Sequence, residues 1–332
     1  MTARIGVVGL GHWGPNLARN FAALGALAAV CEPDEARREA VSANLPGVHG
    51  YARFEDLLAD SSIDAVSIAT PAASHGALVC RAIAAGKHVL VEKPLCLDPD
   101  EGARLAAQAK EAKRVLMVGH LLLYHPAYRA LRDVVHAGQI GDLRYVYSNR
   151  LSLGKIRREE NALWSFAPHD ISMILDLIGE MPVRASASGG TYLAPPVADT
   201  SLTHLTVGAG TQAHIFVSWL HPFKEHRTVV IGSEGMIVFD DVRPGVEKLL
   251  LYPHAVGWQG NLPSVEKAAA LPIPYDKDEP LAVECAHFLE CIATGTEPLS
   301  NAGEALNVLR VLSACQDSLS RGEPIALEAT SP

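Results

Sequence analysis

The sequence contains few cysteines, and none of them forms a CxxC pair. Its six cysteines are scattered along 332 residues, which matches neither the ligand spacing of a zinc site nor a disulfide framework. We therefore expect no metal site. In a chain of this size without an export signal, buried reduced thiols are the expected state, and they indicate a cytoplasmic location.

Long hydrophobic runs and an excess of positive charge are also missing. No apolar segment reaches the length of a membrane span, and the N-terminus is too briefly apolar for a signal peptide. Lys and Arg number 28 against 37 Asp and Glu, which gives a net charge of −9. Because an acidic surface repels nucleic acid and anionic lipid, we expect neither a nucleic-acid partner nor a membrane partner.

The composition and the hydrophobic pattern indicate two domains. Hydrophobic residues make up 48% of the chain, enough for two full cores. Residues 1–120 alternate short apolar runs with helix-length runs, which predicts a doubly wound parallel sheet of the Rossmann type. Residues 121–332 predict an α/β domain with a large, mostly antiparallel open sheet. Its C-terminal helices are free to pack back on the first domain.

Two segments of this second domain are relevant to the candidate site and its surroundings. The pattern predicts a helix from about Phe166 to Leu177, preceded by a polar loop over Leu151–Asn161. The stretch Tyr252–Lys277 holds four prolines and is predicted to be an irregular surface excursion.

A glycine motif lies between the first predicted strand and the first predicted helix. It consists of Gly9, Leu10, Gly11, His12, Trp13 and Gly14. In a GxGxxG fingerprint the first glycine permits the turn, the second lets pyrophosphate approach the backbone, and the third permits close helix packing. The helix N-terminus then offers N–H groups and a partial positive charge to the phosphates. The motif predicts a dinucleotide site.

Glu32 ends the second predicted strand, where an acidic residue binds the ribose diol of NAD. A carboxylate there repels a 2′-phosphate, which favours NAD over NADP. Two alternatives remain. Glu32 could belong to the N-cap region of the next helix, a place that Asp34 fills equally well, and Arg37 and Arg38 could accept the phosphate, although their position favours a solvated helix face.

The fifth predicted strand ends in Glu92, Lys93 and Pro94. Because strand carboxyl ends border the ligand crevice of an open α/β sheet, Lys93 is expected to point at the cofactor. The alternative is a solvated lysine. Against it, Pro94 fixes the following backbone and Glu92 supplies a counter-charge.

These motifs together resemble one family. The glycine motif, Thr70 and Pro71 with His75, and the Glu92-Lys93-Pro94 run occur in this order, and Gly138-Gln-Ile-Gly-Asp follows. The chain is thus similar to the Gfo/Idh/MocA oxidoreductases up to about residue 325. The resemblance implies NAD as cofactor and an open sheet that carries subunit contacts, hence a homo-dimer or homo-tetramer. It also implies that Thr70, Pro71, His75 and Glu92 belong to the cofactor site, and that Lys93 bonds the reacting hydroxyl.

The family also carries an Asp-x-x-x-His element in its second domain. Here His169 matches the histidine, whereas Ser165 replaces the aspartate. Asp170 either compensates for this change or braces the helix. Because the unperturbed pKa of histidine lies near neutral pH, His169 suits the role of proton acceptor. We expect Lys93 and His169 to be the catalytic residues, with either as the acceptor; the alternative for His169 is a helix N-terminal histidine bonded to backbone.

The segment from Gly119 to Tyr128 and the segment from Leu163 to Asp170 resemble the nucleotide-sugar branch of the family. This resemblance implies oxidation of the C3 hydroxyl of a UDP-sugar to a 3-keto sugar, which feeds an aminotransferase in cell-surface glycan or lipid A (lipopolysaccharide) biosynthesis. UDP-N-acetylglucosamine is favoured over its uronate because no further basic residue is committed to a second carboxylate.

Candidate substrate contacts lie in four places, one of which is the segment from Trp164 to Asp170 described above. The cationic loop, Lys155-Ile-Arg157-Arg158, suits a diphosphate, although Glu159 and Glu160 follow it and a mixed charge run is equally consistent with a solvated surface. A second, weaker cluster lies near residue 226. Tyr124 and His125 either meet sugar hydroxyls or pack the domain junction. The candidates are Tyr124, His125, Lys155, Arg157, Arg158, Trp164, Ser165, His169 and Asp170, with Lys224, His226 and Arg227 as the weaker cluster.

Three other functions stay open. An inositol or free-sugar dehydrogenase of the same family would have no use for a cationic loop. An NAD-dependent glycoside hydrolase would form no net NADH. A non-catalytic NAD-binding sensor would need neither Lys93 nor His169.

Overall fold

The computed structural model describes residues 2–154, 156–158, 160–208 and 210–327. The chain divides into two compact units, Met1–Tyr124 with Asp278–Leu309, and His125–Lys277 with Arg310–Pro332. The first unit thus ends at Tyr124 and takes in the C-terminal segment Asp278–Leu309. Within the described residues, no helix has the length and apolar character needed to cross a membrane.

The first unit is built on a parallel sheet of six strands in the order β3-β2-β1-β4-β5-β6. Its strands are β1 (Ile5–Val8), β2 (Leu27–Cys31), β3 (His49–Tyr51), β4 (Ala65–Ile68), β5 (His88–Glu92) and β6 (Leu116–Gly119). Its helices are α1 (Gly14–Ala23), α2 (Glu35–Ser42), α3 (Phe54–Ala59), η1 (Ala72–Ser74), α4 (His75–Ala84), α5 (Pro99–Glu111), η2 (Leu121–Tyr124) and α8 (Pro280–Thr294). This is the predicted doubly wound Rossmann sheet.

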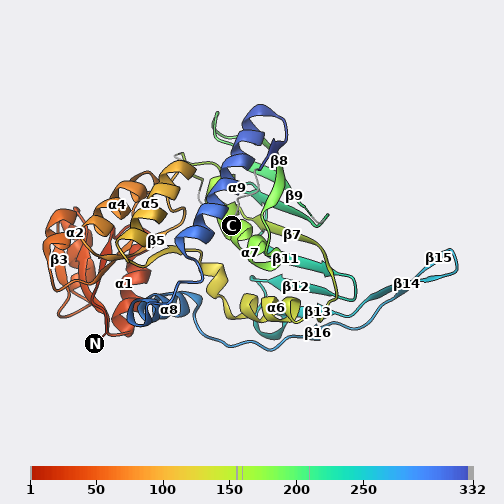
Figure 1. The fold of residues 1–332 in the computed structure, drawn as a ribbon, viewed down its shortest axis with the longest axis horizontal. Helices are drawn as coiled ribbons and strands as arrows, with labels where there is room; N and C mark the ends of the chain where they lie inside the picture. Colours follow the sequence, from red (N-terminus) through yellow and green to blue (C-terminus); the bar gives the residue numbers. More distant parts are fainter. Residues whose placement is uncertain (1, 155, 159, 209, 328–332) are drawn as a thin grey trace. The chain divides into compact units, whose positions relative to one another are not determined.

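Helices cover both faces of this sheet, with α4 and α5 on one side and α1 and α8 on the other (Figure 1). Strands buried on both faces are continuously apolar rather than alternating, and every residue of β1 and β4 is buried. The strand order reverses between β1 and β4. The loops that follow these two strands therefore lie side by side, at the switch point where open α/β sheets bind ligands.

The second unit contains the predicted large sheet, with strands in the order β16-β13-β12-β11-β7-β10-β9-β8-β17. Its strands are β7 (Leu143–Leu151), β8 (Pro182–Gly190), β9 (Thr200–Val207), β10 (Gln212–Ser218), β11 (Glu225–Gly232), β12 (Met236–Asp240), β13 (Leu249–Tyr252), β16 (Leu271–Pro272) and β17 (Ile325–Ala326). Its helices are α6 (Pro126–His136), α7 (Ala162–Ile178) and η3 (Gly245–Lys248), and α9 (Ala302–Arg321) extends through both units. The pairing is antiparallel apart from the parallel pair β7–β10.

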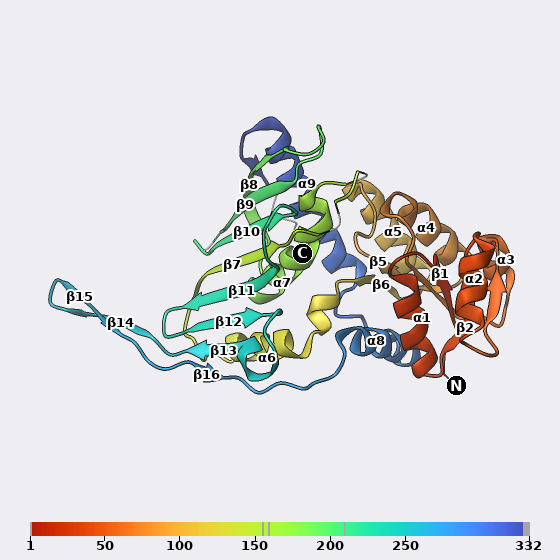
Figure 2. The ribbon, with the colours of Figure 1, turned by 180° about the vertical axis from the view of Figure 1, so that it is seen from behind.

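Helix α7 lies across one face of this sheet (Figure 2). It begins at Ala162, earlier than the predicted start near Phe166. The reason is Asn161, whose side-chain oxygen accepts a hydrogen bond from the Trp164 backbone N–H at 3.0 Å and so caps the helix. Pro168 is then accommodated inside the helix.

Within the segment predicted to be irregular, Tyr252–Lys277, residues 255–266 instead form a hairpin, whereas residues 267–270 and 273–277 have no regular structure. Strands β14 (Ala255–Gln259) and β15 (Leu262–Glu266) pair with each other in a separate two-stranded sheet. The turn between them uses Gly260, whose φ of +62° favours glycine. The hairpin is exposed and extends beyond the large sheet of its unit (Figures 1 and 2). The predicted surface excursion is thus confirmed, and the prediction was wrong only in making residues 255–266 irregular.

Candidate cofactor site and catalytic residues

The three glycines of the GxGxxG motif meet different surroundings. Gly9 has φ +87°, and a Cβ there would lie 2.8 Å from Thr70 Cγ2. A Cβ on Gly14 would lie 1.9 Å from the carbonyl oxygen of Gly9. A Cβ on Gly11, by contrast, would meet no atom within 4 Å. The fold therefore requires glycine at the first and third positions, while the backbone at Gly11 stays open to a ligand, as dinucleotide binding requires.

Within the described residues, neither a capping side chain nor an acidic residue of the first turn competes with an anion at the N-terminus of α1. Trp13 occupies the N-cap position without a capping side-chain hydrogen bond, and the first turn holds no acidic residue. Gly11 and His12 beside it are exposed. The partial positive charge of the helix end therefore remains available to phosphate.

Glu32 is 8% exposed and holds the glycine loop. One of its carboxylate oxygens accepts the backbone N–H of Leu10 at 2.7 Å, and the other accepts that of Asp34 at 3.2 Å. Asp34 itself caps α2 by accepting the Arg37 N–H at 3.0 Å. The N-cap role thus belongs to Asp34, and each Glu32 oxygen keeps acceptor capacity for a ribose hydroxyl.

The two arginines of α2 differ in their surroundings. Arg37 is exposed and pairs loosely with Asp34 at 3.8 Å. Arg38 is half-buried and donates to the backbone carbonyl of Glu32 at 2.6 Å. The prediction of a solvated face therefore fits Arg37 but not Arg38, which braces the end of β2.

The loop after β4 is tied to the loop after β5 through His75. Its imidazole is 1% exposed, with Nδ1 2.7 Å from the Pro94 carbonyl oxygen and Nε2 2.8 Å from that of Thr70. The Thr70 hydroxyl lies 2.8 Å from that of Ser74. His75 therefore braces the two loops on which Thr70, Pro71 and Lys93 stand.

Glu92 and Lys93 are both half-buried at the end of β5. The Trp13 side chain donates a hydrogen bond to the Glu92 carboxylate, which connects β5 to the glycine loop. Burial raises the pKa of Glu92 to about 7, against the opposing effects of Lys93 and of this hydrogen bond. The charge beside Lys93 therefore changes near neutral pH.

In the second unit, His169 is half-buried on α7, and the next residue, Asp170, attaches this helix to the sheet. Asp170 is 0% exposed, and its carboxylate accepts Nε of Arg150 at 2.8 Å and a second guanidinium nitrogen at 3.0 Å. It also accepts the Ser148 hydroxyl at 2.5 Å. Because Arg150 and Ser148 stand on β7, Asp170 pins α7 to the sheet, which favours the bracing role over a ligand contact.

Two other side chains of α7 were candidate substrate contacts. Ser165 is 5% exposed, so a hydroxyl rather than a carboxylate stands at this buried position. The Trp164 indole N–H donates to the Gln316 side-chain oxygen at 3.1 Å, and Asn161 donates to the same oxygen at 2.7 Å. Trp164 is thus tied to α9.

Tyr124 and His125 favour the packing alternative. Tyr124 is 2% exposed, and its hydroxyl lies 2.9 Å from that of Ser300. His125 caps α6 by accepting the Ala127 N–H at 3.1 Å, and its other ring nitrogen lies 3.3 Å from a carboxylate oxygen of Asp241. Neither side chain keeps its polar atoms for a sugar.

The cationic loop is partly neutralised within the chain. Arg157 pairs with Glu160 at 3.0 Å, Arg158 is exposed, and Lys155 lies outside the described residues. The weaker cluster loses more of its charge: burial and nearby Arg150 lower the pKa of His226 to about 3, and Arg227 donates twice to Asp240. The structure therefore favours the loop over the second cluster.

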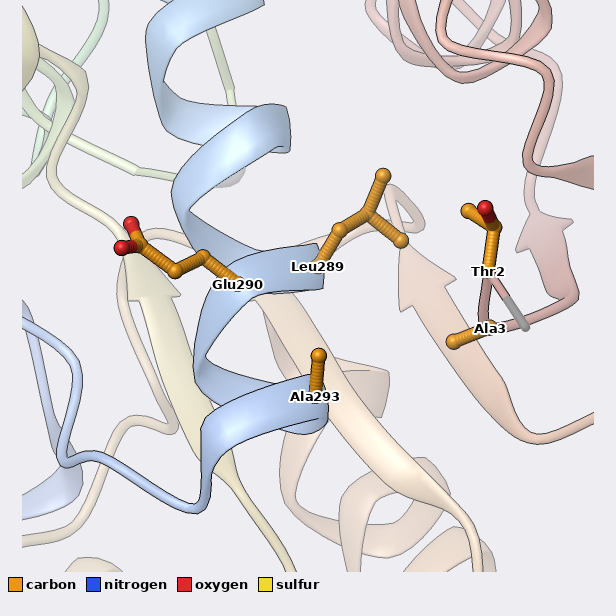
Figure 3. A pocket seen from close by; sticks show the side chains of 5 residues that line it. All are labelled: Thr2, Ala3, Leu289, Glu290 and Ala293. Atoms are coloured by element: carbon orange, nitrogen blue, oxygen red, sulfur yellow. The ribbon is translucent and has the colours of Figure 1, made fainter.

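Sequence reasoning missed a second carboxyl group near Glu92. Glu284 on α8 is 1% exposed, and within the described residues neither of its carboxylate oxygens has a hydrogen-bond partner. An acidic residue in the otherwise apolar run Leu281–Ala286 was the available signal. Helix α8 and the N-terminal segment also line a hollow of about 460 Å³ (Figure 3). No predicted site residue lies in it. Its lining residues are Thr2, Ala3, Leu289, Glu290 and Ala293.

The strand order, the open Gly11 backbone and the acidic residue that ends β2 define the first unit as a dinucleotide-binding domain of an oxidoreductase. Residues 3–120 match the oxidoreductase family with an NAD-binding Rossmann fold, and residues 128–238 match the GFO/IDH/MocA C-terminal domain. The chain therefore belongs to the Gfo/Idh/MocA oxidoreductase family, and its cofactor is NAD.

Three relatives indicate the range of substrates in the family. UDP-N-acetylglucosamine 3-dehydrogenase of Acidithiobacillus ferrooxidans is 32% identical over 87% of this chain and 88% of its own. A structure of that enzyme superposes with a TM-score of 0.85 at 29% identity, covering 97% of this chain and 98% of the other. scyllo-Inositol 2-dehydrogenase (NAD(+)) of Bacillus subtilis is 27% identical over 98% and 96%. dTDP-3,4-didehydro-2,6-dideoxy-alpha-D-glucose 3-reductase of Streptomyces violaceoruber is 34% identical over 62% of each chain.

Glu32→Ala should weaken NAD binding by on the order of 1.5–3 kcal/mol, the value of a hydrogen bond to a charged group. It should also narrow the preference over NADP, because no carboxylate then repels the 2′-phosphate. Glu32→Gln is the matched variant, since its amide oxygen can still accept the Leu10 N–H without the charge. Calorimetric titration with both cofactors measures the effect. Equal affinity of the parent protein for NAD and NADP would exclude Glu32 as the ribose anchor.

Proposed function

We propose that this protein oxidises the C3 hydroxyl of a UDP-sugar, specifically UDP-N-acetylglucosamine, to the 3-keto sugar. The observation that carries the proposal is the similarity to UDP-N-acetylglucosamine 3-dehydrogenase, because it extends over 87% of the chain and thus over both units. The Streptomyces relative is also named for a reaction at C3 of a nucleotide-linked sugar. The product would supply an aminotransferase of cell-surface glycan or lipid A synthesis in the cytoplasm.

Oxidation of a secondary alcohol removes a hydride from carbon and a proton from oxygen. NAD supplies the hydride acceptor when bound at the glycine loop. We assign the proton to Lys93 and His169, with Lys93 bonding the reacting hydroxyl and either side chain accepting its proton. A histidine fits this task because its pKa lies near the working pH.

A free polyol is the second candidate substrate. The scyllo-inositol 2-dehydrogenase matches 98% of this chain, and the pairing of Arg157 with Glu160 weakens the argument from the cationic loop. The sequence identity to UDP-N-acetylglucosamine 3-dehydrogenase, 32%, is higher than the 27% identity to the inositol enzyme, which supports a UDP-sugar as the substrate.

The deciding experiment is a substrate screen with NAD, read at the absorbance of NADH. UDP-N-acetylglucosamine should be oxidised with a kcat/KM at least about tenfold above its uronate and above scyllo- and myo-inositol, the discrimination that about 1.4 kcal/mol provides. If the enzyme prefers an inositol, the substrate is a free polyol and not a nucleotide sugar. Glycoside cleavage without net NADH, or the absence of any turnover, would point to the hydrolase or the sensor.

Neutralising Arg157 and Arg158 together, each to Gln, should raise the KM for the UDP-sugar by roughly tenfold or more while NAD affinity stays the same. Each charge-assisted hydrogen bond to a diphosphate is worth about 1.5–3 kcal/mol. The matched control removes two arginines elsewhere in the second unit, Arg243 and Arg321, which are 58% and 60% exposed. If both double variants have the same KM, the cationic loop is a solvated surface and does not bind the diphosphate.

We also propose that copies of the chain associate through the face of the large sheet opposite α7, as a dimer or a tetramer. Tyr145 and Leu202 are exposed there, and the rings of Tyr147 and His214 stack at 5.2 Å. A monomer at micromolar concentration by analytical ultracentrifugation would contradict this proposal.

A further inference from the structure

Glu284 is a buried acid that the chain does not satisfy. Its side chain stands on α8, 1% exposed, and neither carboxylate oxygen has a hydrogen-bond partner within the described residues. Helix α8 packs against α1, where Phe21 and Phe288 meet edge to face at 6.4 Å. An unpartnered polar group in such packing destabilises the fold and calls for an explanation.

Helix α8 contacts α1 and η2, and Glu284 interacts electrostatically with titratable groups on three elements. These groups are Glu92 at the end of β5, Tyr124 on η2 and Cys285 on α8 itself. Beyond these neighbours, Lys93 and His120 act on Glu92, Glu304 acts on Tyr124, and Arg19 and Glu279 act on Cys285.

Of these three groups, only Glu92 carries charge once the pH exceeds its pKa of about 7. Burial raises the pKa of the Tyr124 hydroxyl and that of the Cys285 thiol, so both stay neutral. Burial and the charge of Glu92 together raise the pKa of Glu284 well above its ordinary value of 4.5. Glu284 therefore retains its proton while Glu92 is the anion.

We propose that Glu284 is a positioning residue that acts through Glu92: as a neutral carboxylic acid it stabilises the anionic form of Glu92, and so maintains the charge beside Lys93. This inference rests on the proposed function. A buried acid that stays protonated can offer an O–H dipole to a neighbouring anion, whereas a hydrocarbon at the same place can offer none. The dipole would explain why α8 retains an acid whose burial weakens the fold.

Two substitutions separate this role from simple packing. Glu284→Met fills a similar volume without a donor, and Glu284→Gln keeps a neutral N–H donor. Glu290→Gln is the control, because Glu290 lies on the same helix with its side chain 68% exposed. The acid keeps its proton in the folded chain at a pH where it is ionised in the unfolded chain, so its burial destabilises the wild type increasingly as the pH rises. Glu284→Met should therefore gain melting temperature over the wild type, and gain more at pH 8 than at pH 5.

The first readout is infrared absorption of the protein without substrate, recorded above the titration of Glu92. The wild type and Glu290→Gln should show the carbonyl stretch of a protonated carboxylic acid, and both Glu284 variants should lack it. If the wild type has no such band, Glu284 is ionised and the proposal fails.

The second readout is the pH dependence of NAD affinity, which requires no substrate. Affinity for the positively charged nicotinamide should fall as Glu92 takes up a proton near pH 7. Glu284→Met should move this midpoint upward by about one pH unit, because the Glu92 anion loses the neighbouring O–H dipole. Glu284→Gln should restore it. The acid limb of kcat, measured with whichever substrate the screen identifies, should move in parallel.

Two results would overturn the proposal: an unmoved midpoint in Glu284→Met, or equal shifts in the Met and Gln variants, which would indicate packing alone. A screen that finds no oxidised UDP-sugar would refute the proposed function instead. The infrared band and the NAD midpoint would still decide the role of Glu284.

Discussion

Lys93→Met and His169→Asn should each lower kcat by roughly 10²–10⁴, the usual contribution of a positioned acid or base. Methionine keeps the length and apolar volume of the lysine while removing its charged donor. Asparagine keeps a polar group while removing the titratable one. NAD affinity should change little in His169→Asn, because the glycine loop and Glu32 remain intact. In Lys93→Met it is compared at a pH well above the titration of Glu92, because loss of the lysine charge raises the pKa of that carboxyl group further.

The double variant tests whether the two side chains act as one unit. Its loss should be far smaller than the product of the single losses, since residues that serve one proton transfer are not additive. Lys110→Met and His136→Asn are matched controls on exposed helix positions. Steady-state kinetics and NAD titration of all the proteins give the comparison. Near-normal turnover in either single variant would mean that another side chain carries the proton.

The Rossmann half could be predicted because its signals are local. Apolar runs buried on both faces, a glycine motif and an acidic strand end each occupy a few consecutive residues, and one topology satisfies all of them. The differing demands on Gly9, Gly14 and Gly11 follow the fingerprint without any long-range information.

What could not be predicted depends on residues distant in the sequence. The sequence leaves Asp170 as either a ligand contact or a brace of the helix. The structure favours the brace, because Asp170 binds Arg150 and Ser148, which lie on a strand 20 and 22 residues earlier. Tyr124 could meet a sugar until Ser300, 176 residues later, was found at its hydroxyl. Glu284 reaches Glu92 only because α8 returns to the first unit.

The hairpin β14–β15 was missed for a different reason. Prolines usually interrupt strands, and the prediction of irregular structure rested on their number. Here Pro263 lies opposite Trp258 in a two-stranded ribbon, where each strand has a free edge that needs no N–H donor from proline.

Asp170→Ala should destabilise the fold by about 3–5 kcal/mol, because it leaves the guanidinium of Arg150 buried without its counter-ion. Asp170 is 0% exposed and Arg150 7% exposed, so water cannot replace the lost partner. The effect should also reach catalysis, since Asp170 fixes the helix turn that carries His169. We expect kcat to fall while NAD affinity, set in the first unit, stays unchanged.

Two comparisons make this test specific to a buried pair. Asp317→Asn removes one partner of an exposed pair with Arg321, 3.9 Å apart, and should cost less than about 1 kcal/mol. The double variant Arg150→Met with Asp170→Leu should recover most of the stability, because apolar residues often replace a buried ion pair without loss. It should not recover kcat if the ion pair also sets the orientation of the His169 side chain. Urea unfolding and steady-state kinetics measure both quantities. If Asp170→Ala costs no more than Asp317→Asn, the buried pair does not hold α7 on β7.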